Sequence, residues 1–204
     1  MMIEDFGPTV TSVWNDLRST TRNLVERAWQ SAASQTAAQP ISSTPYDPRA
    51  DYELSRLLTA LDEQALEAEE SSDQESSRRA RRLADACANV LTQQTQSAEI
   101  FAQLIQRAHE RKDYARVDAL AAMLAERLAP SEICELARSN NVVVRALAQE
   151  ALTQMPAPLL GALLRDPVDA AVARFALERQ AGEYASEEAR QALREFEEFG
   201  LEGF

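Results

Sequence analysis

The fold is decided by two related stretches, LARSNNVVVRALA at residues 136–148 and LRDPVDAAVARFA at residues 164–176. In each, a short apolar segment ends in a polar turn, and a longer segment then opens with small apolar residues and an Arg. A weaker version runs from Ile105 to Ala121. Because a single helical hairpin cannot bury its apolar face alone, repeated hairpins predict a stack of helix pairs with a continuous core.

Apolar residues at three- and four-residue spacing predict helices along most of the remaining chain. No stretch alternates apolar and polar residues with β-branched enrichment, so we expect an all-α fold of stacked antiparallel helix pairs. Ser72 and Glu75 have the spacing of a capping box at the start of one helix. The predicted helices after residue 49 span 50–70, 73–94, 97–110, 113–128, 131–138, 141–154, 158–164, 167–180 and 186–199.

Residues 9–34 form one predicted amphipathic helix, which contains both tryptophans of the chain. Three prolines then fall within Gln35–Arg49, and proline removes backbone donors and favours extended geometry, so no helix is expected to cross this stretch. We therefore divide the chain into an N-terminal amphipathic helix (1–34), a Pro/Ser-rich linker (35–49) and a helical-repeat domain (50–204). The apolar stripe of the tethered helix needs a partner, which is either the main domain or another copy of the chain.

The repeated segment resembles HEAT-like repeats, in which a turn carrying Asp or Asn and Pro precedes a second helix with a Val-Arg-x-x-Ala signature. Asp166-Pro167 and Val144-Arg145-Ala146-Leu147-Ala148 are the closest matches. The resemblance covers about half the chain, and the helices before Ser97 depart from it and are interpreted as a cap. It implies an α-solenoid that binds through an extended surface, with Arg145 and Arg174 pairing with a turn acid such as Asp166.

The charge balance of the chain limits its partners, since the formal net charge is −12. Acidity of this size repels phosphate backbones and anionic lipid, so we expect no nucleic-acid partner and no attachment to a membrane surface. No apolar run reaches about 18 residues, and no basic segment opens the chain, so we expect a cytoplasmic protein. Cys87 and Cys134 each fall on an apolar helical face and are predicted to be reduced core cysteines.

Residues that could carry chemistry are scarce in the sequence. His109 is the single histidine, and it has no second His or Cys at ligand spacing. A Ser-His-Asp or Cys-His mechanism would have to use this same residue. The sequence contains no Gly-rich phosphate loop and no HExxH, CxxC or GxSxG motif. We therefore expect no catalytic residue, no cofactor and no metal.

Interaction with another protein, or with a second copy of the chain, is the function that we expect. The candidate partner-binding residues are an apolar set, Trp14, Leu17, Leu24 and Trp29, and a basic set, Arg78, Arg79, Arg81 and Arg82. The basic set has an alternative role, which is surface pairing with nearby acids such as Glu75. The alternative function is that of a HEAT-like enzyme or nucleic-acid factor of the DNA-glycosylase or lyase kind, which the net charge and the missing motifs disfavour.

Overall fold

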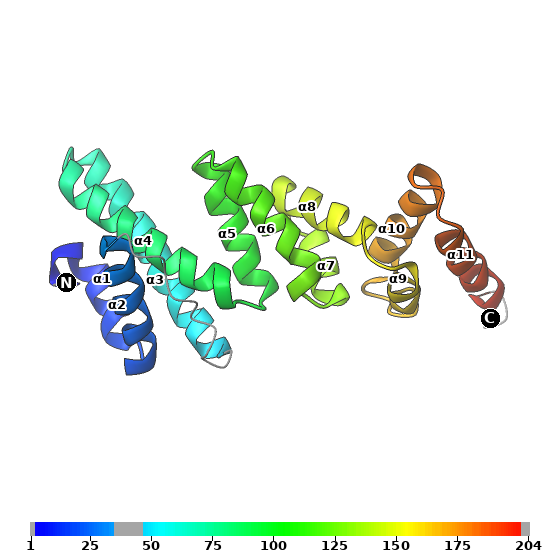
Figure 1. Ribbon diagram of the computed structural model, residues 1–204, viewed down its shortest axis with the longest axis horizontal. Coiled ribbons are helices and arrows are strands. Elements are labelled where there is room, and N and C mark those ends of the chain that lie inside the picture. The colour runs from blue at the N-terminus through cyan, green and yellow to red at the C-terminus, as the bar shows by residue number, and fades with distance from the viewer. Residues whose placement is uncertain (1–2, 35–46, 201–204) are drawn as a thin grey trace. The chain divides into compact units, whose positions relative to one another are not determined.

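The computed structural model describes residues 3–34 and 47–200, and this part of the chain is helical without a strand (Figure 1). The predicted all-α fold class is confirmed, and the helices pack in pairs. The chain divides into two compact units, Met1–Thr95 and Gln96–Phe204. The first unit contains a 3-10 helix η1 (Ile3–Phe6), α1 (Gly7–Asp16), α2 (Ser19–Ser34), α3 (Pro48–Glu70) and α4 (Gln74–Gln94). The second contains α5 (Ala98–Glu110), α6 (Tyr114–Arg127), α7 (Pro130–Ala137), α8 (Val142–Thr153), α9 (Ala157–Leu163), α10 (Ala170–Glu183) and α11 (Glu187–Gly200).

The segment predicted as one N-terminal helix consists of two helices, so that prediction was wrong in detail. The chain leaves helical geometry at Leu17, where ψ is 144° and the side chain is buried. Together η1, α1 and α2 form the N-terminal arm (Ile3–Ser34), in which α1 packs on α3 and α2 packs mainly on α4. The division between the two compact units falls after Thr95, so the arm belongs to the same unit as α3 and α4.

Most of the predicted linker, residues 35–46, lies outside the described residues. Pro48 and Arg49, which were predicted as linker, are the first residues of α3, and Asp47 is its N-cap. The carboxylate of Asp47 accepts a hydrogen bond of 2.9 Å from the amide of Arg49, and Pro48 occupies the first helical position. Both residue types suit a helix N-terminus, because the carboxylate satisfies a free amide and proline has none to satisfy.

The turn between α3 and α4 is set by a residue in the left-handed conformation, Ser72, whose φ is 60°. The amide of Asp73 donates to the carbonyl of Ala68 at 2.8 Å and that of Ser72 donates to Glu69 at 3.0 Å, which is a Schellman motif. The side chain of Asp73 then accepts from the amide of Ser76 at 3.1 Å. Asp73 therefore closes one helix and caps the next, and the predicted capping box of Ser72 and Glu75 was wrong by one residue.

The turn between α5 and α6 repeats this arrangement 40 positions later. Lys112 has a φ of 57°, the amide of Asp113 donates to Ala108 at 2.9 Å, and the Asp113 carboxylate caps α6 through the amide of Arg116 at 3.1 Å. The two hairpins thus share one turn design, although they belong to different compact units.

Within the second unit α6 packs on α8 and α8 packs on α10, while α5 packs on α7 and α7 on α9. The second helices share a register, since Leu120, Ala148 and Ala176 are buried at a constant spacing of 28 residues, as are Leu124, Leu152 and Gln180. At this spacing Arg145 aligns with Ala173, so the predicted equivalence of Arg145 and Arg174 is out by one residue. Helix α10 begins three residues later than predicted, because the carboxylate of Asp166 accepts from the amide of Val168 at 2.8 Å and holds that segment in a turn.

Candidate interaction surfaces

The first two turns of the second helices in the second unit carry exposed apolar residues, most of them alanines, on the side away from the core. Residues two positions before and two after a buried residue near the start of each helix (Val117, Val144 or Ala173) point away from the core, because a separation of two residues rotates a side chain by about 200° on a helix. The two largest of these side chains are Val142 and Phe175, which are 66% and 45% exposed. This apolar face comprises Ala115 and Ala119 of α6, Val142 and Ala146 of α8, and Ala171 and Phe175 of α10.

The hairpins of the second unit are joined by an arginine and a turn acid, but not by the predicted pair. Arg138 follows α7 and donates to the carboxylate of Asp169 at 2.6 Å and to the carbonyl of Val168 at 3.2 Å. Arg145 instead donates to the carbonyl of Ser139 in its own turn at 2.8 Å. Arg174 pairs with Glu178 and Glu197, at 3.0 and 3.2 Å. The predicted pairing of Arg145 or Arg174 with Asp166 is therefore wrong, and Arg138 with Asp169 makes the link.

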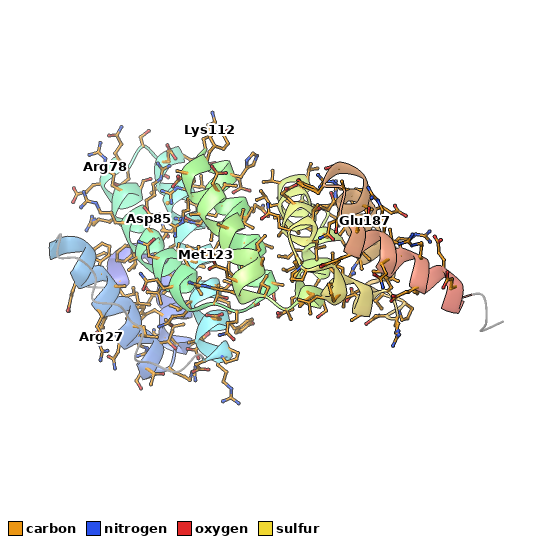
Figure 2. The ribbon with its side chains drawn as sticks, turned by 45° about the vertical axis from the view of Figure 1, so that its right-hand side comes forward. Arg27, Arg78, Asp85, Lys112, Met123 and Glu187 are labelled. Atoms are coloured by element: carbon orange, nitrogen blue, oxygen red, sulfur yellow. The ribbon has the colours of Figure 1, made fainter. Side chains whose placement is uncertain are left out.

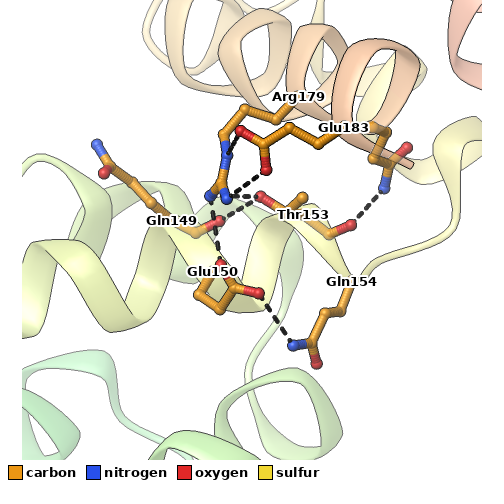
Figure 3. Close-up of polar contacts among 7 residues, drawn as sticks. Gln149, Glu150, Thr153, Gln154, Arg179 and Glu183 are labelled. Atoms are coloured by element: carbon orange, nitrogen blue, oxygen red, sulfur yellow. Dashed lines mark hydrogen bonds and ion pairs between the residues drawn. The ribbon is translucent and has the colours of Figure 1, made fainter. Parts of the chain in front are cut away.

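A polar network joins α8 to α10 around Arg179 (Figure 3). Its guanidinium donates to Glu183 at 2.8 Å, to Glu150 at 3.3 Å and to the hydroxyl of Thr153 at 3.3 Å. The hydrogen bond with Glu183 raises the pKa of Arg179, and the same contact lowers the pKa of the Glu183 carboxyl. The network therefore links α8 to α10, which belong to neighbouring hairpins.

Gln180 provides a buried link between the same two helices. Its side-chain amide donates to the carbonyls of Thr153 and Met155, at 2.9 and 2.6 Å. These carbonyls lie at the end of α8, where no helical amide follows to bind them. The sequence analysis missed this residue, although its place among Ala173, Ala176 and Leu177 on the buried face of α10 is a signal for a polar group with a structural role.

The basic set on α4 is partly neutralised by acids. Arg79 pairs with Glu75 at 3.6 Å and reaches Asp5 of the arm at 4.0 Å, and Arg81 pairs with Glu69 of α3. Arg78 and Arg82 are exposed, and Figure 2 shows Arg78 extending away from the helix. The alternative role considered for this set, surface pairing, is therefore present for two of the four arginines.

The apolar set of the N-terminal arm is divided between buried and partly exposed positions. Trp14 and Leu17 are only 7% and 4% exposed, while Leu24 and Trp29 are half-buried. The first pair is therefore accessible to a partner only if the arm moves. The second pair lies on α2 and keeps part of its surface open in this conformation.

The break between α1 and α2 is held by Glu53 of α3. Its carboxylate accepts from the Arg18 side chain at 2.8 Å and from the Arg18 amide at 3.4 Å, and it also accepts from the hydroxyl of the buried Thr21. Arg18 pairs in addition with Asp47 at 2.9 Å. The hydrogen bond with Glu53 is the largest cause that raises the pKa of Arg18. The Glu53 carboxylate thus accepts hydrogen bonds from both Arg18 and Thr21 at the start of α2.

The two cysteines and the single histidine are the remaining residues that could take part in catalysis or metal binding. Both Cys87 and Cys134 are buried free thiols, as predicted, and burial raises the pKa of Cys134 to about 11. His109 is exposed and lies edge-on to Tyr114, with ring centroids 6.2 Å apart. Over residues 3–34 and 47–200, no group of three or more His, Cys, Asp or Glu side chains is placed to hold a metal ion. No helix in these ranges is long and apolar enough for a membrane span.

Comparisons of this chain with protein-family models, with curated proteins and with solved structures found no match.

Proposed function

We propose that the chain is a HEAT-like scaffold that binds another protein through the apolar face of α6, α8 and α10. The observation that carries this proposal is the recurrence of exposed apolar side chains on the outer sides of three consecutive second helices. Single exposed apolar residues are ordinary on a protein surface, whereas exposed apolar residues that recur on neighbouring packed helices indicate a site of contact.

Contacts between neighbouring hairpins of the second unit support this role. The Arg138–Asp169 pair, the Arg179 network and the buried Gln180 amide each join one hairpin to the next. A surface composed of several helices can bind specifically only if their spacing is fixed, because a loose surface loses conformational entropy when it binds. These links therefore supply the preorganisation that a binding face requires.

Site-specific photo-crosslinking in cells would test the proposal. A crosslinking amino acid at Ala146, which is exposed on α8, is expected to capture a protein reproducibly. The matched control is Glu135, which is exposed on α7, a first helix of a hairpin, and lies off the apolar face. Equal capture from both positions, or capture from Glu135 alone, would contradict the proposal.

The affinity of the captured protein for purified variants would then locate the contact. Phe175→Glu introduces a charge into the apolar face and is expected to weaken binding by about tenfold or more. Leu159→Glu is the matched control, because Leu159 of α9 is 47% exposed, close to the 45% of Phe175, but lies on a first helix. A larger loss of affinity from the control than from Phe175→Glu would place the interface elsewhere.

A further inference from the structure

The N-terminal arm presents one continuous buried stripe to α3 and α4. Its members recur at three- or four-residue intervals across the break between α1 and α2, so the break does not turn the stripe away from the hairpin. The stripe consists of Phe6, Val10, Trp14, Leu17, Thr21 and Val25. The arm therefore lies on α3 and α4 as one amphipathic element with a bend.

A seam of ion pairs accompanies this stripe. Arg79 of α4 reaches Asp5 at 4.0 Å, Arg56 of α3 reaches Asp16 at 3.6 Å, and Glu53 of α3 binds Arg18 at 2.8 Å. The pairs run from the start of the arm to the start of α2. Most of these side chains are substantially exposed, so salt weakens the attraction, because mobile ions screen exposed charges.

Glu53 differs from the other members of the seam, because its side chain is only 16% exposed. It accepts from the side chain and amide of Arg18 and from the hydroxyl of Thr21. The negative carboxylate also interacts favourably with the positive N-terminal end of the α2 helix dipole. Loss of its charge would weaken several charge-assisted hydrogen bonds together, and all of them join the arm to α3.

The α3–α4 hairpin has structural links that do not involve the arm. The Schellman turn around Ser72 and the cap at Asp73 fix the connection between the two helices. In addition, the buried hydroxyl of Ser77 donates to the carbonyl of Ala65 at 2.9 Å, which ties α4 to α3. The hairpin can therefore keep its geometry when the arm leaves.

We propose that the N-terminal arm is a strap that opens as one unit from an intact α3–α4 hairpin, with Glu53 as the latch. Opening exposes Trp14 and Leu17 together with the hairpin surface that they cover. Closure is favoured at low ionic strength, where the seam is strongest. This proposal concerns the first unit alone and does not depend on the binding role proposed for the second.

Hydrogen exchange of the full chain would test the strap directly. Under conditions in which exchange reports the opening equilibrium, Glu53→Gln is expected to speed exchange of the arm amides about tenfold, because it weakens hydrogen bonds to a charged acceptor. Exchange of the buried amides of α3 and α4 is expected to stay unchanged. Glu63→Gln is the matched control, since Glu63 is exposed on the same helix, and it is expected to leave the arm unchanged.

A second variant weakens the closed arm through backbone strain and not through charge. Gly7 has a φ of 86°, which residues with a Cβ rarely adopt, and a Cβ there would also displace the flexible tip of the Gln64 side chain on α3. Gly7→Ala is therefore expected to speed arm exchange about fivefold, with α3 and α4 again unaffected. Both tryptophans lie in the arm, so their emission should shift to longer wavelength in each variant and, in the wild type, on raising salt from about 0.05 to about 0.5 M.

Two results would overturn the proposal. The first is that the amides of the arm and of the hairpin have equal protection factors in the wild type, and that both sets change together in Glu53→Gln. The arm would then open only when the whole unit unfolds. The second is that Glu53→Gln and Gly7→Ala leave arm exchange unchanged.

Discussion

Replacement of Gln180 by Ala should destabilise the second unit more than any surface change on the same helices. The wild-type side chain is 6% exposed and donates two hydrogen bonds, to the carbonyls of Thr153 and Met155. Without it, two carbonyls at the end of α8 lose a partner in a site with little access to water. Leaving such a group unsatisfied costs about 1–3 kcal/mol, so the expected loss of unfolding free energy is about 2–4 kcal/mol.

Urea unfolding followed by far-UV circular dichroism would measure this loss. For a unit of this size the corresponding fall in midpoint temperature is about 10–20 °C. Gln180→Leu separates the hydrogen bonds from the packing, since it keeps most of the volume and removes both donors, and it should lose most of the same free energy. Gln191→Ala is the control, because that exposed side chain bonds only to Glu195 in the described part of the chain. A Gln180→Ala protein within about 0.5 kcal/mol of the wild type would refute the structural role of this amide.

Three further predictions follow from other features. Ser72→Gly and Lys112→Gly should each raise the unfolding free energy by about 0.5–1 kcal/mol, because glycine adopts the positive φ of these turns without strain. Lys112→Ala is the control, and it should not raise the unfolding free energy. Burial raises the pKa of the Cys134 thiol to about 11 from an ordinary value of 9.0. Its contribution to stability is therefore complete below about pH 9 and is lost as pH rises toward 11. Cys134→Ala should flatten this part of a plot of unfolding free energy against pH, and an unchanged slope would argue against the buried thiol. Arg179→Gln should return the lowered pKa of Glu183 toward its ordinary value, which an NMR titration of the carboxyl would detect, whereas an unchanged titration would mean that Arg179 is not its partner in solution.

The helix pattern could be predicted from the sequence because most of its signals are local. For example, the helices predicted at 73–94 and 97–110 are observed at Gln74–Gln94 and Ala98–Glu110. Asp47 and Pro48 are also local signals of a helix start, but the linker prediction overlooked them. The repeat also places Arg145 and Arg174 in the second helices α8 and α10, although the structure sets them one residue out of register.

The errors arose where tertiary contacts decide the outcome. No proline or glycine marks the break at Leu17, and the structure stabilises it through Glu53, which lies far along the chain. Asp73 replaces the predicted cap because Ser72 takes the left-handed position that ends α3. Likewise, Arg138 and not Arg145 reaches a neighbouring turn acid, and residue spacing alone could not distinguish the two.

The binding face proposed for α6, α8 and α10 is tested most directly by the dissociation constant of a crosslinked partner for the Val142→Glu, Phe175→Glu double variant. Both side chains are exposed, so the substitutions should leave the circular dichroism spectrum and unfolding free energy close to those of the wild type. We expect affinity to fall by about a hundredfold if the two positions contribute separately. A fully folded double variant that binds the partner with wild-type affinity would contradict the account.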